Sequence, residues 1–245
     1  MLKELLDIKK IGVSGVKLEY ESEFYDEKSA YALSELVHRV GLDLCVKLGG
    51  FSSIQDLHMC KKLCANSIVA PMVESKYAVE KFLACINEVY RKGYPELFLN
   101  IESKTAFENI EDILSVCDKR ISGLVLGRSD LIRSLGIENP DDEVVLSYCL
   151  RLSELCKELD KKFIIGGKIN SDSIDFISKI PYLSAIETRK VIFDVSSLNE
   201  TNINEFLQFE LKSLQFKNSI YKEDVKRIKF IQKSLEEKEL VNSQI

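Results

Sequence analysis

Histidine is scarce in this chain of 245 residues, which has only His38 and His58. Both fall in stretches with helical periodicity, away from the ends of the predicted strands. This placement argues against a Ser-His-Asp or Cys-His enzyme and against a zinc site built on histidine.

Long apolar runs are also missing. No run approaches the roughly 20 residues of a membrane-spanning helix, and the first residues lack the apolar core of a signal peptide. Basic residues form no dense patch before the C-terminal tail, and the net charge is −5. We therefore expect a cytoplasmic protein with neither a nucleic-acid nor a membrane partner.

The seven cysteines show no metal-binding pattern. Cys60 and Cys64 are four residues apart on a predicted helix, without histidines nearby. The others are scattered over helical and strand-like segments. We expect reduced thiols that pack as small hydrophobic side chains.

What the chain does contain is a regular alternation of short apolar runs and longer helical stretches. The strand-like runs are 12–20, 42–50, 67–73, 97–102, 121–127, 162–169 and 182–193. Alternating strands and helices with short connections indicate a parallel sheet. Seven such units favour a TIM-type (β/α) barrel, with a doubly wound sheet as the runner-up. The stretch before Ile11 reads as helical, so we expect the barrel to lack a regular first strand unless another element fills that place.

Two regions follow from this pattern. Residues 1–200 are predicted to form the catalytic barrel, and residues 201–245 a C-terminal extension of two amphipathic helices. Phe206, Phe209, Leu211, Leu214 and Phe216 make the first of these helices strongly apolar. Such a helix packs on the barrel or on a neighbouring subunit, so we expect a homo-oligomer.

Charged and polar side chains mark nearly every strand end. In chain order they are Glu19 and Glu21, Lys47, Glu74, Asn100 and Glu102, Arg128 and Asp130, Lys168, and the run Glu187, Thr188, Arg189 and Lys190. The carboxyl ends of barrel strands form the active-site face. Gathered on one rim, these residues predict a polar site that handles anions.

Glu102 and Asp130 end two successive strands and are expected to lie side by side. Two carboxylates with open positions suit a hard divalent cation such as Mg²⁺. Each residue also sits just before or at the start of a helix, where a carboxylate can cap the helix instead. Both interpretations stay open from spacing alone.

Glycines next to other strand ends allow a ligand to approach the backbone. Gly49 and Gly50 follow Lys47, and Gly166 and Gly167 end another strand. Neither pair belongs to a nucleotide-phosphate motif. In the run 187–190, Glu187 and Arg189 share one face, which predicts either a salt bridge inside the barrel or a contact with an anionic substrate.

Four segments resemble the HpcH/HpaI aldolase and citrate lyase beta-subunit family of the phosphoenolpyruvate/pyruvate barrel superfamily. They are "NIESKTAFENIEDI", "GLVLGRSDLIRSLG", "SIVAPMVES" and "DLCVKLGG". The resemblance covers about 16–193. It implies a metal-dependent carbon–carbon lyase or aldolase that acts on pyruvate or a related 2-keto acid with an aldehyde or acyl acceptor. The product could then be a 2-keto-3-deoxy sugar acid.

The resemblance also implies roles for single residues. Glu102 and Asp130 would hold Mg²⁺, Mn²⁺ or Co²⁺, and Lys47 would contact the enolate oxygen or the carboxylate. Glu19 and Glu21 fall near an acidic or histidine-bearing strand end of the family and are, with Lys47, the catalytic candidates. The predicted substrate-binding residues are Lys47, Gly49, Gly50, Arg128, Arg189 and Lys190.

The chain departs from the family in places that leave other functions open. Lys47 stands where the family has arginine, the catalytic histidine of the aldolase branch has no counterpart, and the Pro-Lys of the citrate lyase branch is Pro71-Met72. One alternative is a lysine Schiff-base aldolase that uses one of the strand-end lysines Lys17, Lys47, Lys168 or Lys190. Another is a catalytically degenerate barrel that serves as a binding subunit.

Overall fold

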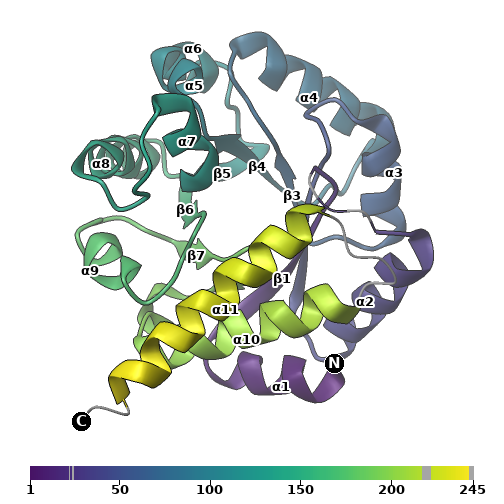
Figure 1. Cartoon of the computed structure of the whole chain (residues 1–245). Coiled ribbons are helices and arrows are strands. Elements are labelled where there is room, and N and C mark those ends of the chain that lie inside the picture. The colour runs from purple at the N-terminus through teal and green to yellow at the C-terminus, as the bar shows by residue number, and fades with distance from the viewer. Residues whose placement is uncertain (22, 24, 217–221, 243–245) are drawn as a thin grey trace.

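The computed structural model describes residues 1–21, 23, 25–216 and 222–242. A closed barrel of eight strands in the order β1 to β8 lies at its centre (Figure 1). The strands are β1 (Val13–Glu19), β2 (Asp43–Lys47), β3 (Ser67–Ala70), β4 (Glu96–Ile101), β5 (Ile121–Gly127), β6 (Lys162–Gly166), β7 (Ala185–Glu187) and β8 (Val191–Phe193). The predicted TIM-type barrel is confirmed, and a doubly wound open sheet is excluded.

Helices surround the barrel (Figure 1). They are α2 (Glu27–Arg39), α3 (Ile54–Lys62), α4 (Lys76–Tyr90), α5 (Lys104–Glu108), α6 (Ile110–Leu114), α7 (Arg128–Leu135), α8 (Glu143–Glu158) and α9 (Ser173–Ser178). Several begin at a side chain that accepts a backbone N–H of the first turn, as Asp26, Ser53, Ser75, Ser103 and Asp142 do. No helix in the described part of the chain is long and apolar enough to cross a membrane.

The last strand-like run is two strands rather than one. β7 and β8 are antiparallel, and β8 closes the barrel against β1, also antiparallel. Between them, Thr188 N donates to Val191 O at 2.9 Å, and Thr188 Oγ1 accepts from the N–H groups of Lys190 and Val191 at 3.2 Å each. These bonds fold the residues 188–190 into a tight turn that an apolar pattern does not reveal.

The first strand is therefore present, and the strand missing from the sequence pattern was the eighth. Helix α1 (Leu2–Lys10) precedes a regular β1 that pairs in parallel with β2. The expectation of a missing first strand is therefore wrong: the extra strand comes from the short β7–β8 hairpin, whose β8 pairs with β1.

Two C-terminal helices lie against this hairpin side of the barrel (Figure 1). They are α10 (Glu200–Phe216) and α11 (Lys222–Asn242), after a short 3-10 helix Val195–Ser197. Phe206 of α10 packs on Phe193 of β8, with ring centroids 4.5 Å apart. Residues 217–221 and 243–245 of the predicted extension lie outside the described residues, and the expected contact with a neighbouring subunit stays a prediction.

Inside the barrel, an apolar layer lies below a polar one. Cys45, Val69, Phe98, Val125 and Ile164 form a buried cluster of inward-facing side chains. Because inward positions alternate along a strand, the next inward positions toward the carboxyl ends carry Lys47, Pro71, Asn100, Gly127 and Gly166. The functional site lies above this apolar layer, which Lys17 of β1 interrupts in register with Cys45.

Candidate active site

Lys47, at the end of β2, is the central cation of the barrel mouth. Its Nζ lies 2.5 Å from Glu21 Oε2, 3.4 Å from Glu102 Oε2 and 3.9 Å from Glu19 Oε1. Burial lowers the pKa of Lys47, but the three carboxylates outweigh burial and raise it above its ordinary value. Lys47 is therefore a buried ammonium at neutral pH.

Glu102, at the end of β4, is almost completely buried, with 1% of its surface exposed. Its Oε1 accepts the Met72 N–H at 2.9 Å, and its Oε2 accepts the Asn100 amide at 2.6 Å. Burial raises the pKa of Glu102, although Lys47 opposes this. A side chain at Gly127 would place its Cβ 2.6 Å from Glu102 Oε2, so the glycine leaves room for this carboxylate.

Asp130, in the first turn of α7, is the predicted partner of Glu102. Its charge raises the pKa of Glu102, as expected for two neighbouring strand ends. Its Oδ1 lies 2.9 Å from Arg133 Nη1 on the exposed side. Asp130 is thus near enough to affect the pKa of Glu102, while its own carboxylate pairs with Arg133.

Neither carboxylate caps a helix with its side chain. Ser103, not Glu102, accepts the N–H of Ala106 at the start of α5. Helix α7 begins after Gly127, without a side-chain cap. Among the described residues, no group of three or more His, Cys, Asp or Glu has metal-site geometry. A cation here would depend on two carboxylates together with other oxygen ligands.

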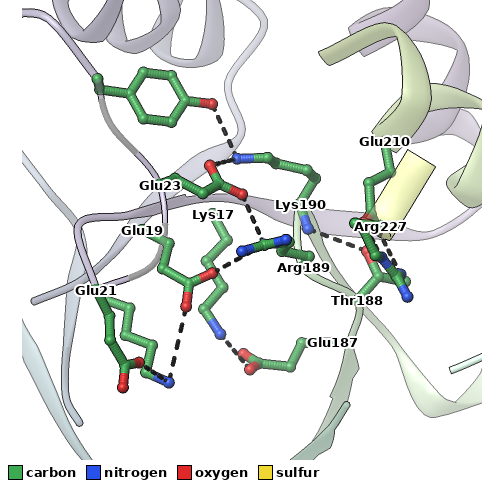
Figure 2. Close-up of polar contacts among 12 residues, drawn as sticks. Lys17, Glu19, Glu21, Glu23, Glu187, Thr188, Arg189, Lys190, Glu210 and Arg227 are labelled. Carbon is green, nitrogen blue, oxygen red and sulfur yellow. Dashed lines mark hydrogen bonds and ion pairs between the residues drawn. The ribbon is translucent and has the colours of Figure 1, made fainter. Parts of the chain in front are cut away.

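A second group of charges fills the side of the mouth next to β1 and the β7–β8 turn (Figure 2). Arg189 Nε lies 2.8 Å from Glu23 Oε1 and 3.4 Å from Glu19 Oε2. Lys190 Nζ makes a short contact with Glu23 and donates to Tyr25 Oη at 2.9 Å. Burial raises the pKa of Glu19, but Lys47, Lys17 and Arg189 outweigh this and hold it at about 2.

Lys17 and Glu187 form an ion pair deeper in the barrel (Figure 2). Both are about 95% buried, with 5% of each residue exposed. Burial lowers the pKa of Lys17, but Glu187 more than offsets it and the pKa is raised. Of the two interpretations of Glu187, the structure shows the salt bridge inside the barrel.

Two predicted substrate-binding residues do not reach the open part of the mouth. Arg128 has no exposed surface and donates to the carbonyls of Gly166 and Gly167 at 3.3 and 2.9 Å, besides its ion pair with Asp141. Lys190 is likewise fully buried. Their predicted contacts with substrate remain predictions, but both side chains already have structural partners.

Gly49 and Gly50 lie on the side of the mouth that Glu23 and Tyr25 form. They line a groove of about 620 Å³ together with Tyr20, Glu23, Tyr25, Ser52, Ser53 and Asp56. The Gly49 N–H donates to Asp56 Oδ2 at 2.7 Å. This carboxylate therefore occupies a backbone donor that an anionic ligand would need.

The C-terminal helices connect to the mouth through Thr188. Its hydroxyl hydrogen-bonds to the buried Glu210 of α10. Burial raises the pKa of Glu210, but Arg227 and the Thr188 hydroxyl outweigh burial and lower it. Arg227 of α11 holds Glu210 in a bidentate pair at 2.5 and 3.0 Å. The helices thus hold the turn that carries Arg189 (Figure 2).

No role was predicted from the sequence for Glu23 and Tyr25, and Asn100 was predicted only as a strand-end residue. Lys17 was predicted only as a possible Schiff-base lysine, and Glu187 only as a member of a salt bridge or an anion contact. A usable signal was present. Lys17, Glu19, Glu21 and Glu23 follow one another at every second position, which places charges on one face of an extended chain. That face proves to be the barrel interior and its rim.

Comparisons with known proteins agree with the fold. Residues 30–159 match the family model described as HpcH/HpaI aldolase/citrate lyase. No curated protein sequence matches the chain.

Three solved structures are similar over most of their length. Citrate synthase SbnG is 18% identical and has a TM-score of 0.63, over 88% of this chain and 89% of that one. A HpcH/HpaI aldolase/citrate lyase family protein from Burkholderia cenocepacia J2315 is 12% identical, with a TM-score of 0.64 over 88% and 90%. The HpcH/HpaI aldolase from Desulfitobacterium hafniense DCB-2 is 13% identical, with a TM-score of 0.61 over 87% and 88%. At these identities, the structural likeness shows the fold alone.

Proposed function

Because the chain belongs to the HpcH/HpaI aldolase/citrate lyase family, we propose that it is a divalent-metal-dependent carbon–carbon lyase or aldolase. Its substrate is pyruvate or a related 2-keto acid, which reacts through its enolate. The family's lyase and aldolase chemistry identifies the protein as an enzyme of this general type. The metal, the keto acid and the acceptor are parts of the proposal.

The observation that carries the proposal is the unpartnered oxygen of Asn100. Its amide donates to Glu102, while its Oδ1 is buried and has no hydrogen-bond partner among the described residues. A buried acceptor of this kind needs a donor or a cation. Together with the carboxylates of Glu102 and Asp130, it gives a set of oxygen ligands that suits Mg²⁺, which keeps several waters and binds substrate oxygens.

The residues present therefore fit a hard divalent cation. Glu102, Asp130 and Asn100 would hold it. When bound, such an ion acts as a Lewis acid that polarises a carbonyl oxygen. Polarisation of the keto oxygen favours the loss of a proton from the neighbouring carbon, which converts a 2-keto acid into its enolate.

The chain's own cations would bind and orient the anionic substrate. Lys47 is a permanent point charge next to Glu102 and attracts a carboxylate without the bidentate geometry of arginine. Arg189 is held by Glu19 and Glu23, with 16% of its side chain exposed at the mouth.

The contacts disfavour a lysine Schiff-base mechanism. That mechanism needs a neutral amine. Lys17, Lys47 and Lys190 are each paired with a carboxylate, and their pKa values are raised. We expect borohydride to trap no pyruvate adduct, Lys168 included. Trapping on any of the four lysines would reverse this preference.

Isothermal titration of oxalate, a mimic of the pyruvate enolate, tests the proposal. The wild-type protein should bind oxalate with Mg²⁺ and lose binding in EDTA. Glu102→Gln should weaken binding by about 100-fold or more, since even second-shell changes at metal sites cost about 10–100-fold. The matched control is Glu108→Gln, whose side chain is 61% exposed on α5.

The degenerate-barrel alternative predicts the opposite result. A protein that binds neither Mg²⁺ nor oxalate under any of these conditions would support a binding subunit without catalysis. Equal oxalate affinity in the presence of Mg²⁺ and of EDTA would contradict the metal site.

A further inference from the structure

Glu187 has an oxygen for which the fold provides no partner. Its side chain projects into the barrel from the end of β7, and Oε1 is held by Lys17. Its Oε2 is buried and has no hydrogen-bond partner among the described residues. Figure 2 shows the carboxylate pointing toward Lys17, with no contact drawn from it to Glu19, Arg189 or Glu23. An unpaired carboxylate oxygen at this depth needs a functional explanation.

Two glycines direct Glu187 toward the metal side of the mouth. Gly127 of β5 and Gly166 of β6 are in register. A Cβ on Gly127 would meet Glu102 Oε2 at 2.6 Å, and a Cβ on Gly166 would meet Glu187 Cγ at 2.7 Å. Glu102 from β4 and Glu187 from β7 therefore lean over the same strand pair from opposite sides. A ligand bound beside Glu102 would therefore lie close to the Glu187 carboxylate.

The other rim carboxylates are already engaged. Glu19 and Glu21 face Lys47, and Glu23 is held by Arg189 and Lys190. The two histidines are on the outer helices, where His38 Nε2 lies 3.1 Å from the Leu63 carbonyl. Proton transfer to or from a substrate carbon requires a group with a free lone pair within reach. Glu187 Oε2 has lone pairs that no described residue engages.

We propose that Glu187 is the catalytic base that removes a proton from the carbon next to the keto group of the bound 2-keto acid. This inference rests on the proposed function. The C–H bond breaks and an O–H bond forms at Oε2. The electron pair forms the carbon–carbon double bond of the enolate, and the negative charge passes to the keto oxygen.

The same proton is returned when the enzyme forms a carbon–carbon bond. When the enolate carbon attacks an aldehyde, the new alkoxide takes the proton back from Glu187, which is again a carboxylate. Lys17 holds Oε1 throughout and fixes the direction of Oε2. Lys17 is in this sense a positioning residue.

Exchange of the pyruvate methyl protons in D₂O, followed by ¹H NMR with Mg²⁺ present, tests the proposal without any acceptor. The wild-type protein should exchange them. Glu187→Gln should slow exchange by about 100-fold or more, the usual contribution of a general base. Glu187→Asp should restore part of the rate, and Glu108→Gln should match the wild type. Oxalate affinity in Mg²⁺ should stay within about threefold of the wild type for each variant, because the Glu102 side of the site is unchanged.

A double variant protects the test against a folding defect. Glu187→Gln leaves Lys17 buried without its partner, whereas Lys17→Met with Glu187→Gln removes both charges. The double variant should fold, bind oxalate and still fail to exchange the methyl protons.

The outcomes separate the two proposals. Wild-type exchange rates in Glu187→Gln would overturn the base assignment. Loss of oxalate binding in that variant would also overturn it, because Glu187 would then hold the ligand. A wild-type protein that binds oxalate through Mg²⁺ but exchanges no protons would overturn the base and keep the metal site. If the wild-type protein showed no metal-dependent oxalate binding, the result would contradict the proposed function itself.

Discussion

The two halves of the barrel mouth differ in how their polar groups are paired. The paired half comprises Glu19, Glu23, Tyr25, Arg189 and Lys190, and each of these has a partner of complementary charge or a hydrogen bond. The open half comprises Asn100, Glu102, Asp130 and Glu187. Here Asn100 Oδ1 and Glu187 Oε2 have no hydrogen-bond partner among the described residues.

The difference indicates which half is scaffold and which is site. Burying a charge is costly unless it is paired, so the paired half keeps its geometry without a ligand. Unsatisfied buried oxygens persist only where the rest of the structure holds them. A ligand that brings donors or a cation would therefore bind to the open half. Substitutions in each half should therefore have different effects on stability and on ligand binding.

Lys190→Met should have the largest effect on stability. It removes the buried partner of Glu23 and Tyr25, although Arg189 still faces Glu23. We expect the free energy of unfolding to fall by about 3 kcal/mol or more, the scale of a broken buried pair. Urea denaturation measures it.

The control is Lys179→Met, on an exposed pair with Glu143 at 3.3 Å. Such pairs contribute little, so unfolding should change by no more than about 0.5 kcal/mol. If the two variants lose the same small amount, the paired half is not a scaffold.

Glu19→Gln should remove a pH dependence that belongs to the paired half. The folded-state pKa of Glu19 is about 2, below the ordinary 4.5, because Lys47, Lys17 and Arg189 outweigh burial. A lowered carboxyl pKa stabilises the fold above the ordinary value, and this contribution is lost as pH falls through 4.5 toward 2. It amounts to about 3 kcal/mol at neutral pH.

Urea titrations at a series of pH values, without added metal, compare the two proteins. The stability difference between wild type and Glu19→Gln should be largest near neutral pH and shrink below about pH 4.5. A difference that stays constant with pH would mean that the Glu19 carboxylate is not selectively stabilised in the fold.

The barrel and its rim could be predicted because they follow from local patterns. Apolar runs of four to seven residues alternate with capped helices, and charges follow the runs at Glu19, Lys47 and Glu102. Parallel strands bring such ends together whatever the details of packing. The eighth strand could not be predicted, because three residues of turn lie inside one apolar run and Thr188 holds them by side-chain bonds.

The division of the rim into a paired half and an open half could not be predicted from the sequence either. Sequence spacing places Arg128 and Asp130 equally well at a strand end. Only the folded structure shows that the Arg128 side chain pairs with Asp141 and donates to the carbonyls of Gly166 and Gly167. Likewise, Glu19 and Glu187 look alike in the sequence. Their difference comes from the number of cations that surround each, which depends on long-range packing.

Glu102→Gln should have the smallest effect on stability, with a sign opposite to that of Glu19→Gln. Burial raises the pKa of Glu102, so its ionisation costs stability as pH rises from the ordinary 4.5 through the raised value. A neutral amide removes that cost. Its new N–H can also bond to Asn100 Oδ1, which is free to accept.

In EDTA at neutral pH, we expect Glu102→Gln to be as stable as the wild type or more stable by about 1 kcal/mol. Adding Mg²⁺ with oxalate should then raise the melting temperature of the wild type and leave that of the variant unchanged, because only the wild type binds the pair. A loss of several kcal/mol in EDTA would show that Glu102 is held as tightly as Glu19. The two halves would then be scaffold alike, and the carboxylate at the end of β4 would have to be explained by folding rather than by a ligand.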